Sequence, residues 1–183
     1  MTMTSFDELE RAIPDWAKDL RLNLGFVQQS AVLTPRQLWG TALACALACK
    51  HAELVAVVAA RASEHLEPLE REAAASAAAI MAMNNVYYRF THLVSDTRYQ
   101  SMPARLRMQI LGKPGVAKLD YELWCMAVSA INGCGACMDS HAKAVIAGGG
   151  TAEQVQEVVR VGAILAGVAQ ALSASAMLRS SQA

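Results

Sequence analysis

Alanine supplies 35 of the 183 residues, close to one in five, and this excess constrains the fold more than any other feature of the sequence. Alanine has the highest intrinsic helix propensity, and the β-branched and aromatic runs typical of strands are scarce. Apolar residues make up 54% of the chain and charged residues 17%, so disorder is excluded and a large core can be buried. We therefore expect an all-α globular protein, with residues 1–183 forming a single domain.

Capping signals and prolines divide this chain into helices. Ser5 with Glu8, and Thr151 with Gln154, have the spacing of helix N-terminal caps, and Thr34-Pro35 adds a proline at the first helical position. No segment is predicted to be a strand. The expected helices begin at Ser5 and then cover about 14–22, 35–49, 51–62, 68–90, 103–111, 120–131, 134–148 and 151–178.

An internal repeat relates two parts of the chain. Leu38-Trp39 and Cys49 have counterparts 85 positions later in Leu123-Trp124 and Cys134. Ala-rich helices also match one another by chance, but these residues share one offset, which favours an internal duplication of a helical unit with halves at about 35–92 and 120–178. The second half has Glu122, Cys137 and His141 where the first has Gln37, Ala52 and Ala56. A functional site is therefore expected within residues 122–141.

Charge and hydropathy restrict the partners and the location. Sixteen Lys and Arg balance sixteen Asp and Glu, so no basic excess is present to bind nucleic acid. The N-terminal residues include early acidic groups and no apolar signal region, which predicts a cytoplasmic protein. Residues 161–178 carry no charge, but their Ala, Gly and Ser content favours a buried core helix over a membrane span.

Two of the five cysteines form a C-x-x-C pattern, Cys134 and Cys137, directly after the helix-breaking Asn132-Gly133. Positions i and i+3 share a helical face, close enough for a disulfide, and a helix N-terminus favours thiolates. His141 lies one turn after Cys137 and can accept its proton. If the two helices pack as a hairpin, Glu122 can orient His141.

The residues alone leave some roles open. The helix N-terminus favours Cys134 as the reactive thiol, whereas the position of His141 favours Cys137. A zinc site is disfavoured because zinc needs four ligands and only His141 is an obvious third. Outside this pattern the cysteines are expected to be inert core thiols, the histidines to have no role and the methionines to fill core gaps. These are Cys45, Cys49 and Cys125; His51, His65 and His92; and Met81, Met83 and Met126.

The pattern E-x11-C-x-x-C-x3-H resembles the active site of the alkylhydroperoxidase AhpD family, within the carboxymuconolactone decarboxylase-like superfamily. The segments AIPDWAKDLRLNL, QLWGTALA, AAAIMAMNNVYYR, ELWCMAVSAINGC and GVAQAL extend the resemblance along nearly the whole chain. The resemblance implies an all-helical fold, a homo-oligomer that is a trimer in the family, and antioxidant reduction of organic hydroperoxides. It implies no bound cofactor and no metal.

Carried over by position, the resemblance makes Cys137 the peroxidatic nucleophile and Cys134 the resolving thiol, with Glu122 and His141 as a proton relay. It implies dihydrolipoamide as the external reductant, held by a lipoylated 2-oxoacid dehydrogenase component, and the peroxiredoxin AhpC as a further partner. Ala136 departs from the pattern, because the best-known members have a histidine there. The route of the second proton is therefore open.

The working hypothesis is a lipoyl-dependent alkyl hydroperoxide reductase that uses the C-x-x-C pair. One alternative is a disulfide reductase that serves AhpC and has weak direct peroxidase activity. Another is a non-catalytic oligomeric scaffold in which the C-x-x-C pattern is incidental. Lactone decarboxylation, the other activity of the superfamily, is disfavoured because a redox C-x-x-C has no part in it.

Overall fold

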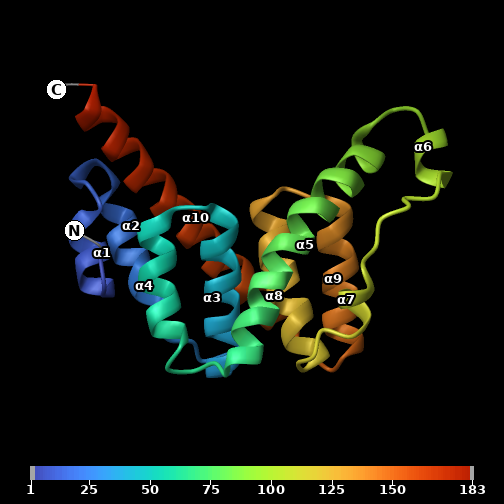
Figure 1. Ribbon diagram of the computed structural model, residues 1–183, viewed down its shortest axis with the longest axis horizontal. Coiled ribbons are helices and arrows are strands. Elements are labelled where there is room, and N and C mark those ends of the chain that lie inside the picture. Colours follow the sequence, from blue (N-terminus) through green and yellow to red (C-terminus); the bar gives the residue numbers. More distant parts are fainter. Residues whose placement is uncertain (1–2, 182–183) are drawn as a thin grey trace.

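The computed structural model describes residues 3–181, and within that range it contains helices, turns and loops but no strand. The chain is 76% helical, which confirms the all-α prediction. Figure 1 shows the order of the helices. The elements are α1 (Phe6–Ala12), η1 (Asp15–Ala17), α2 (Lys18–Leu24), η2 (Gly25–Val27), α3 (Pro35–Cys49), α4 (Ala52–Ala62), α5 (Pro68–Leu93), α6 (Arg98–Ser101), α7 (Gln109–Gly112), α8 (Lys118–Ile131), α9 (Gly135–Ala147) and α10 (Ala152–Ser180).

The helix starts follow the predicted caps. Ser5 accepts a hydrogen bond from the backbone N–H of Glu8, and Thr34 and Thr151 each complete a reciprocal capping box with the glutamine three residues later. His51, expected to have no role, caps α4, because its Nδ1 accepts from the backbone N–H of Leu54 at 3.3 Å. Each cap satisfies a backbone donor that a helix start leaves free.

The predicted helix over 103–111 is wrong in most of its length. Residues 102–108 have no helical structure, and only α7 is helical at the end of the predicted range. The residue before a proline is pushed toward extended backbone, and Met102 adopts ψ 137° before Pro103. Arg105 then takes a left-handed conformation, with φ 52°, that a continuous helix does not allow. The segment is therefore an irregular strap between α6 and α7.

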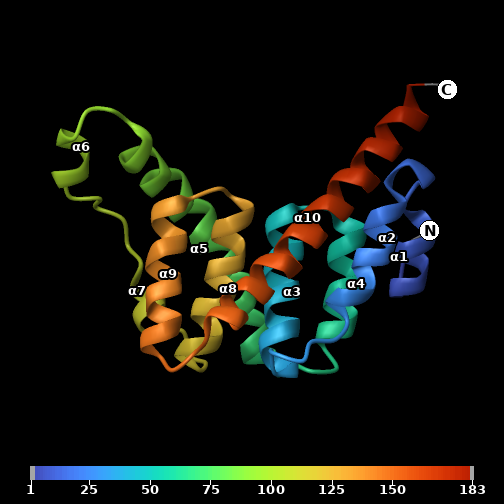
Figure 2. The same ribbon diagram turned by 180° about the vertical axis from the view of Figure 1, so that it is seen from behind.

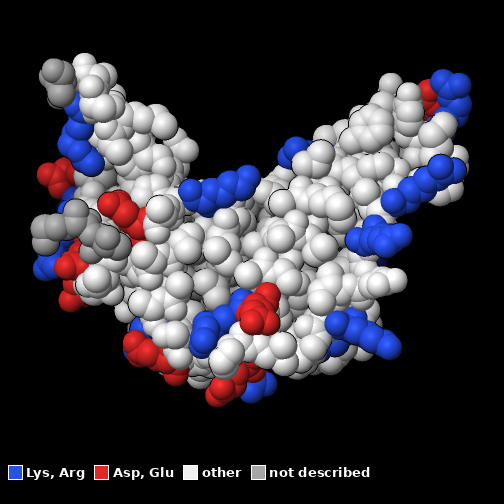
Figure 3. Space-filling view, in the orientation of Figure 1, with Lys and Arg blue, Asp and Glu red and all other residues white. Residues whose placement is uncertain are grey.

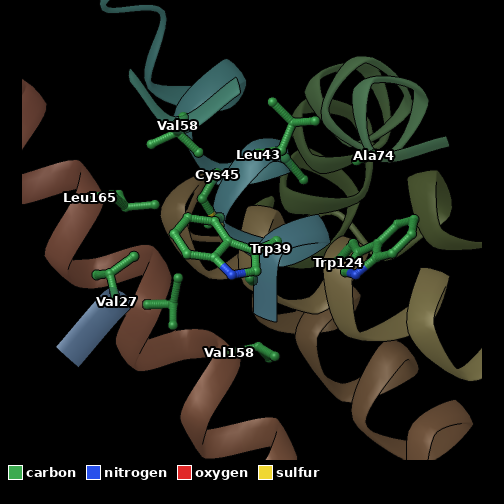
Figure 4. Close-up of a cluster of buried hydrophobic side chains, with 14 of the residues drawn as sticks. Val27, Trp39, Leu43, Cys45, Val58, Ala74, Trp124, Val158 and Leu165 are labelled. Atoms are coloured by element: carbon green, nitrogen blue, oxygen red, sulfur yellow. The ribbon is translucent and has the colours of Figure 1, made fainter. Parts of the chain in front are cut away.

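The core is built where α3, α8 and α10 pack against one another. Trp39 on α3 and Trp124 on α8 are among its largest fully buried side chains, and Figure 4 shows both with Leu165 and Val158 of α10 nearby. The C-terminal half of α5 and the end of α10 rise from this body at opposite ends and leave a hollow between them (Figures 1 and 2). Figure 3 shows the same hollow between the two raised ends, with Lys or Arg side chains along its floor.

Two sets of three helices occur in the same order. Helices α8, α9 and α10 start 83, 83 and 84 positions after α3, α4 and α5, near the 85-residue offset of the sequence repeat. Each of the two core tryptophans lies in the first helix of its set, Trp39 as the fifth residue of α3 and Trp124 as the seventh of α8. This order agrees with a duplicated helical unit, while the exact halves, 35–92 and 120–178, stay a prediction.

Helix α10 is the one helix, within the described part of the chain, that is long and apolar enough to cross a membrane. Half of its apolar window is buried inside the protein, mainly where it contacts α3 and α8. Buried core helices meet the same criteria of length and composition, and the packing of α10 follows that pattern.

Gly40 of α3 lies directly against the side chain of Trp124 on α8. A Cβ atom at this position would overlap the indole ring of Trp124, whereas nothing lies within 4 Å of a Cβ atom at Gly25. Gly40→Ala is expected to lower the free energy of unfolding by about 2–3 kcal/mol, because a close-packed core cannot accept the methyl group without moving the tryptophan. Chemical denaturation measures the loss, with Gly25→Ala as the matched control; equal stability of the two variants would contradict the packing argument.

Candidate active site

Glu122 and His141 are brought together by the hairpin of α8 and α9. The Nδ1 atom of His141 lies 2.6 Å from Oε2 of Glu122, and both side chains are buried. A carboxylate only accepts hydrogen bonds, so the Nδ1–H group of His141 donates and Nε2 is left as the nitrogen that gains or loses a proton. The structure thus places Glu122 and His141 in contact, and the role of Glu122 in orienting His141 stays a prediction.

The carboxyl group of Glu122 stays ionised in this setting. Burial raises its pKa, but hydrogen bonds from His141 and Lys118 and their positive charges lower it by more, so the pKa of Glu122 lies below its ordinary value. Lys118 lies one turn before Glu122 on α8 and pairs with the other carboxylate oxygen from a half-exposed position. Lys118 was not among the predicted site residues, although its i, i+4 spacing from Glu122 is a signal for such a pair.

Cys134 and Cys137 form a disulfide with a Cα–Cα distance of 5.3 Å. Cys134 is the N-cap of α9, and its sulfur accepts from the backbone N–H of Cys137 at 3.3 Å. Cys134 is fully buried, whereas Cys137 is 6% exposed and faces a cavity. The two sulfurs therefore differ in access, although they share a helix start.

The cavity in front of Cys137 has a volume of about 370 Å³, and its wall combines apolar side chains with several polar ones. Helix α9 supplies one side, α5 supplies the opposite side, and the strap after α6 closes one edge together with α7. Cys134 is not part of the wall. The lining residues are Met81, Asn84, Tyr88, Met108, Leu111, Ala136, Cys137, Ser140 and His141. A larger cavity of about 600 Å³, lined mainly by α5, α3 and the end of α8, contains none of the predicted site residues.

Ala136, the position that departs from the resemblance, lies on the cavity wall beside Cys137. It also lines a neighbouring cavity of about 260 Å³, and Tyr88 is the other residue that the two cavities share. The small methyl group of Ala136 therefore leaves the region between the two cavities less filled than a larger side chain would.

The other three cysteines lie in environments that make their thiols unreactive. Cys45 and Cys125 are completely buried, and burial raises the pKa of each thiol well above its ordinary value. Burial also raises the pKa of Cys49 to about 11. Thiols that remain protonated at neutral pH are poor nucleophiles, as the sequence analysis expected.

Met81 was expected to fill the core, and it is indeed 1% exposed. Its sulfur, however, lies 3.2 Å from Nε2 of His141, so Met81 is also part of the site. The signal was present in the segment AAAIMAMNNVYYR, which carries Met81, Asn84 and Tyr88, all on the cavity wall. Helical periodicity alone could not separate this methionine from core methionines, because the same face of α5 serves both purposes.

No group of three or more His, Cys, Asp or Glu side chains between residues 3 and 181 is arranged to hold a metal ion. The residues place the Cys134–Cys137 disulfide on the same helix as His141, which contacts Glu122, within an all-helical scaffold. That combination defines the class of protein: an all-helical protein with a disulfide-forming cysteine pair beside a buried histidine–carboxylate contact.

Comparison with known proteins identifies the family within that class. Residues 97–180 match the carboxymuconolactone decarboxylase family. Alkyl hydroperoxide reductase AhpD of Methylocella silvestris is 52% identical over 171 residues, which cover 93% of this chain and 96% of that protein. The AhpD proteins of Streptomyces avermitilis and Gluconacetobacter diazotrophicus are 48% and 50% identical over 174 residues, covering 95% of this chain and 98% and 96% of theirs. The chain belongs to the AhpD family.

Proposed function

We propose that this protein is an alkyl hydroperoxide reductase that uses Cys137 and Cys134 as a thiol–disulfide pair. The observation that carries the proposal is the difference in access between the two sulfurs: Cys137 shares a cavity with His141, and Cys134 is buried behind it. The apolar side chains in the wall of that cavity suit the alkyl part of an organic hydroperoxide. The names of the AhpD relatives point to the same activity.

In the proposed mechanism, Nε2 of His141 takes the proton of the reduced Cys137 thiol, while Glu122 holds Nδ1 and stabilises the imidazolium that forms. The Cys137 thiolate attacks the terminal oxygen of the hydroperoxide, the O–O bond breaks, and the alkoxide takes a proton to leave as an alcohol. Cys137 is left as a sulfenic acid. Cys134 then displaces water from it and closes the disulfide, which the Cα–Cα distance of 5.3 Å allows.

The cycle needs an external dithiol, which we propose to be the dihydrolipoamide of a lipoylated 2-oxoacid dehydrogenase component, in the cytoplasm. The dithiol attacks the sulfur of Cys137, the member of the disulfide that lines the cavity, and forms a mixed disulfide before it closes its own ring. We also propose that the protein forms a homo-oligomer, specifically a trimer. Exposed apolar side chains at both raised ends of the molecule support it: Val86, Phe90, Leu93, Met177 and Leu178.

The test is a peroxidase assay in which dihydrolipoamide is the only reductant and cumene or tert-butyl hydroperoxide the substrate. The proposal expects consumption of hydroperoxide that saturates with both substrates, and the loss of two titratable thiols per chain when the reduced protein meets peroxide. A protein that loses no thiols under peroxide would be a scaffold with an incidental C-x-x-C.

A disulfide reductase that serves AhpC is the second candidate, because Cys137 lines a cavity and its disulfide can exchange with the thiols of a protein as with those of a small dithiol. The same assay is run with and without added AhpC. Hydroperoxide consumption that requires AhpC would assign the reductase role, whereas consumption by this chain alone supports the direct activity.

Ala136→His is expected to change the pH dependence of the reaction. An imidazole at this position would lie on the wall beside Cys137 and add a group with an ordinary pKa of about 6.5. We expect the profile of kcat/KM against pH to gain an inflection near that value. Ala136→Phe, of similar bulk and without a titrating group, is the matched control. Identical profiles for the wild type and the histidine variant would show that the relay is complete without a second histidine.

A further inference from the structure

Met81 has an unusual environment for a buried methionine. Its sulfur lies 3.2 Å from Nε2 of His141 and 3.3 Å from Oγ of Ser129, and it accepts from Nδ2 of Asn85 at 3.7 Å. The Nδ2 group of Asn85 also donates to Ser129, at 3.0 Å. A thioether sulfur is a weak acceptor, so three potential donors surround an atom that satisfies them poorly.

Met81 also lines the cavity that holds Cys137. Once Cys134 and Cys137 are joined as a disulfide, Cys137 has no thiolate to react with an incoming hydroperoxide. Met81 and Met108 are then the remaining lining residues, within the described part of the chain, that carry a nucleophilic sulfur.

We infer that Met81 is an oxidation site, at which an organic hydroperoxide in the active-site cavity converts the thioether to a sulfoxide when reductant is exhausted. The inference rests on the proposed function, because it needs the hydroperoxide to enter this cavity. It assigns to Met81 a modification that limits the activity of the enzyme.

The step balances without a further reactant. A lone pair of the Met81 sulfur attacks the terminal oxygen of ROOH; the O–O bond breaks as the S–O bond forms. The sulfur is oxidised by two electrons, and the peroxide is reduced by the same two. The proton of the terminal oxygen passes to the departing alkoxide, which leaves as ROH.

The polar surroundings favour the product over the thioether. A sulfoxide oxygen is a strong acceptor, and the Ser129 hydroxyl, the Asn85 amide and the protonated Nε2 of His141 lie around the sulfur to donate to it. A hydrogen bond from Nε2–H to the sulfoxide would keep the proton on His141. His141 could then no longer accept the proton of Cys137, and turnover would stop even after the disulfide is reduced again.

Mass spectrometry of the wild-type protein tests the site. The protein in its disulfide form is treated with cumene hydroperoxide, digested, and each methionine is examined for the added oxygen. Met83, on the same helix but outside the cavity wall, and Met177, which is 70% exposed, are the references. Met108 reports whether peroxide reaches the cavity, since it lines the wall with a single donor, the Tyr88 hydroxyl, at 3.8 Å.

We expect the sulfoxide at Met81 to form several-fold faster than at Met83 and Met177, and at least as fast as at Met108. Oxidation of Met108 or Met177 with Met81 left unmodified would overturn the inference. Turnover with dihydrolipoamide is measured on the same preparation before treatment, so a failure of the proposed function is seen there and is not confused with a failure at Met81.

A variant links the modification to activity. Met81→Leu conserves the volume of the side chain and removes the sulfur. Each protein is treated with peroxide, reduced with dihydrolipoamide and assayed, and its activity is divided by that of its own untreated sample. The wild type should lose activity in proportion to the Met81 sulfoxide. The variant should have the same activity after treatment as its own untreated sample. An equal loss in both proteins would show that inactivation does not pass through Met81.

Discussion

Cys137→Ser is expected to abolish the dihydrolipoamide-dependent reduction of hydroperoxides, with kcat/KM reduced by about three orders of magnitude or more. The serine hydroxyl is of similar size, so the cavity and the α9 helix start should remain, but a hydroxyl is a far weaker nucleophile than a thiolate at neutral pH. Initial rates with cumene hydroperoxide and with tert-butyl hydroperoxide measure the loss.

Cys134→Ser separates the two thiols. Cys134 is fully buried and lies outside the cavity wall, so its loss should leave the first attack on peroxide intact and block the closing of the disulfide. We expect one equivalent of alcohol per chain and a sulfenic acid at Cys137, detected with a sulfenic-acid-specific reagent. Steady turnover should be lost in this variant, but the first turnover should remain.

Cys49→Ser is the matched control, because Cys49 is a half-buried thiol of high pKa on α3, away from the site. It should keep wild-type turnover. If instead Cys134→Ser lost the first turnover and Cys137→Ser kept it, the helix N-terminus would outweigh the histidine, and the roles of the two thiols would be reversed.

The helices could be predicted from the sequence where a local signal marked each end. Thr34, Thr151 and Cys134 stand at the N-caps of α3, α10 and α9, and each prediction needed only the few residues that form one helical turn. The prediction around Pro103 was wrong because the proline suggested a helix start, whereas the neighbouring backbone has extended and left-handed conformations. No capping residue precedes that proline, so the local signal was incomplete.

The site residues also divide into those that local sequence predicts and those that only tertiary packing brings together. Cys134, Cys137 and His141 lie within eight consecutive residues, and a single helix brings them together. Predicting the contact of Glu122 also required the α8–α9 hairpin, and a short connection between two helices favours such a hairpin. Met81 is 60 positions from its partner His141, and only the packing of α5 across the hairpin brings them into contact. A pattern of spacing along one helix holds no information about such a contact.

Glu122→Gln is expected to lower kcat/KM at neutral pH by about 100-fold, although the new side chain has nearly the same shape. The carboxylate accepts the Nδ1–H bond of His141 and leaves Nε2 free to take the proton of Cys137. The amide can instead donate to Nδ1, which moves the ring proton to Nε2, and His141 then cannot serve as a base. His141→Gln should give a loss of similar size, and the double variant should be little worse than either single one.

The pH profile distinguishes this positioning role from simple destabilisation. Free thiols ionise at about pH 8.5, so raising the pH supplies the Cys137 thiolate without a base, and the Glu122→Gln variant should recover toward the wild type between about pH 8 and 10. In the wild type the pKa of Glu122 is lowered, so its carboxylate is ionised at every pH above the ordinary pKa of a glutamate. The carboxylate is lost only when the pH falls through the lowered pKa. No inflection from Glu122 is therefore expected above about pH 4.5.

Lys118→Met is the control for the charge around Glu122, because Lys118 pairs with the same carboxylate from a half-exposed position and does not contact His141. A half-exposed ion pair contributes about 1 kcal/mol or less, so this variant should stay within about fivefold of wild-type activity and keep its profile shape. A loss in Lys118→Met as large as in Glu122→Gln, with no recovery of either at high pH, would show that the carboxylate maintains the structure of the site and does not set the tautomer of His141.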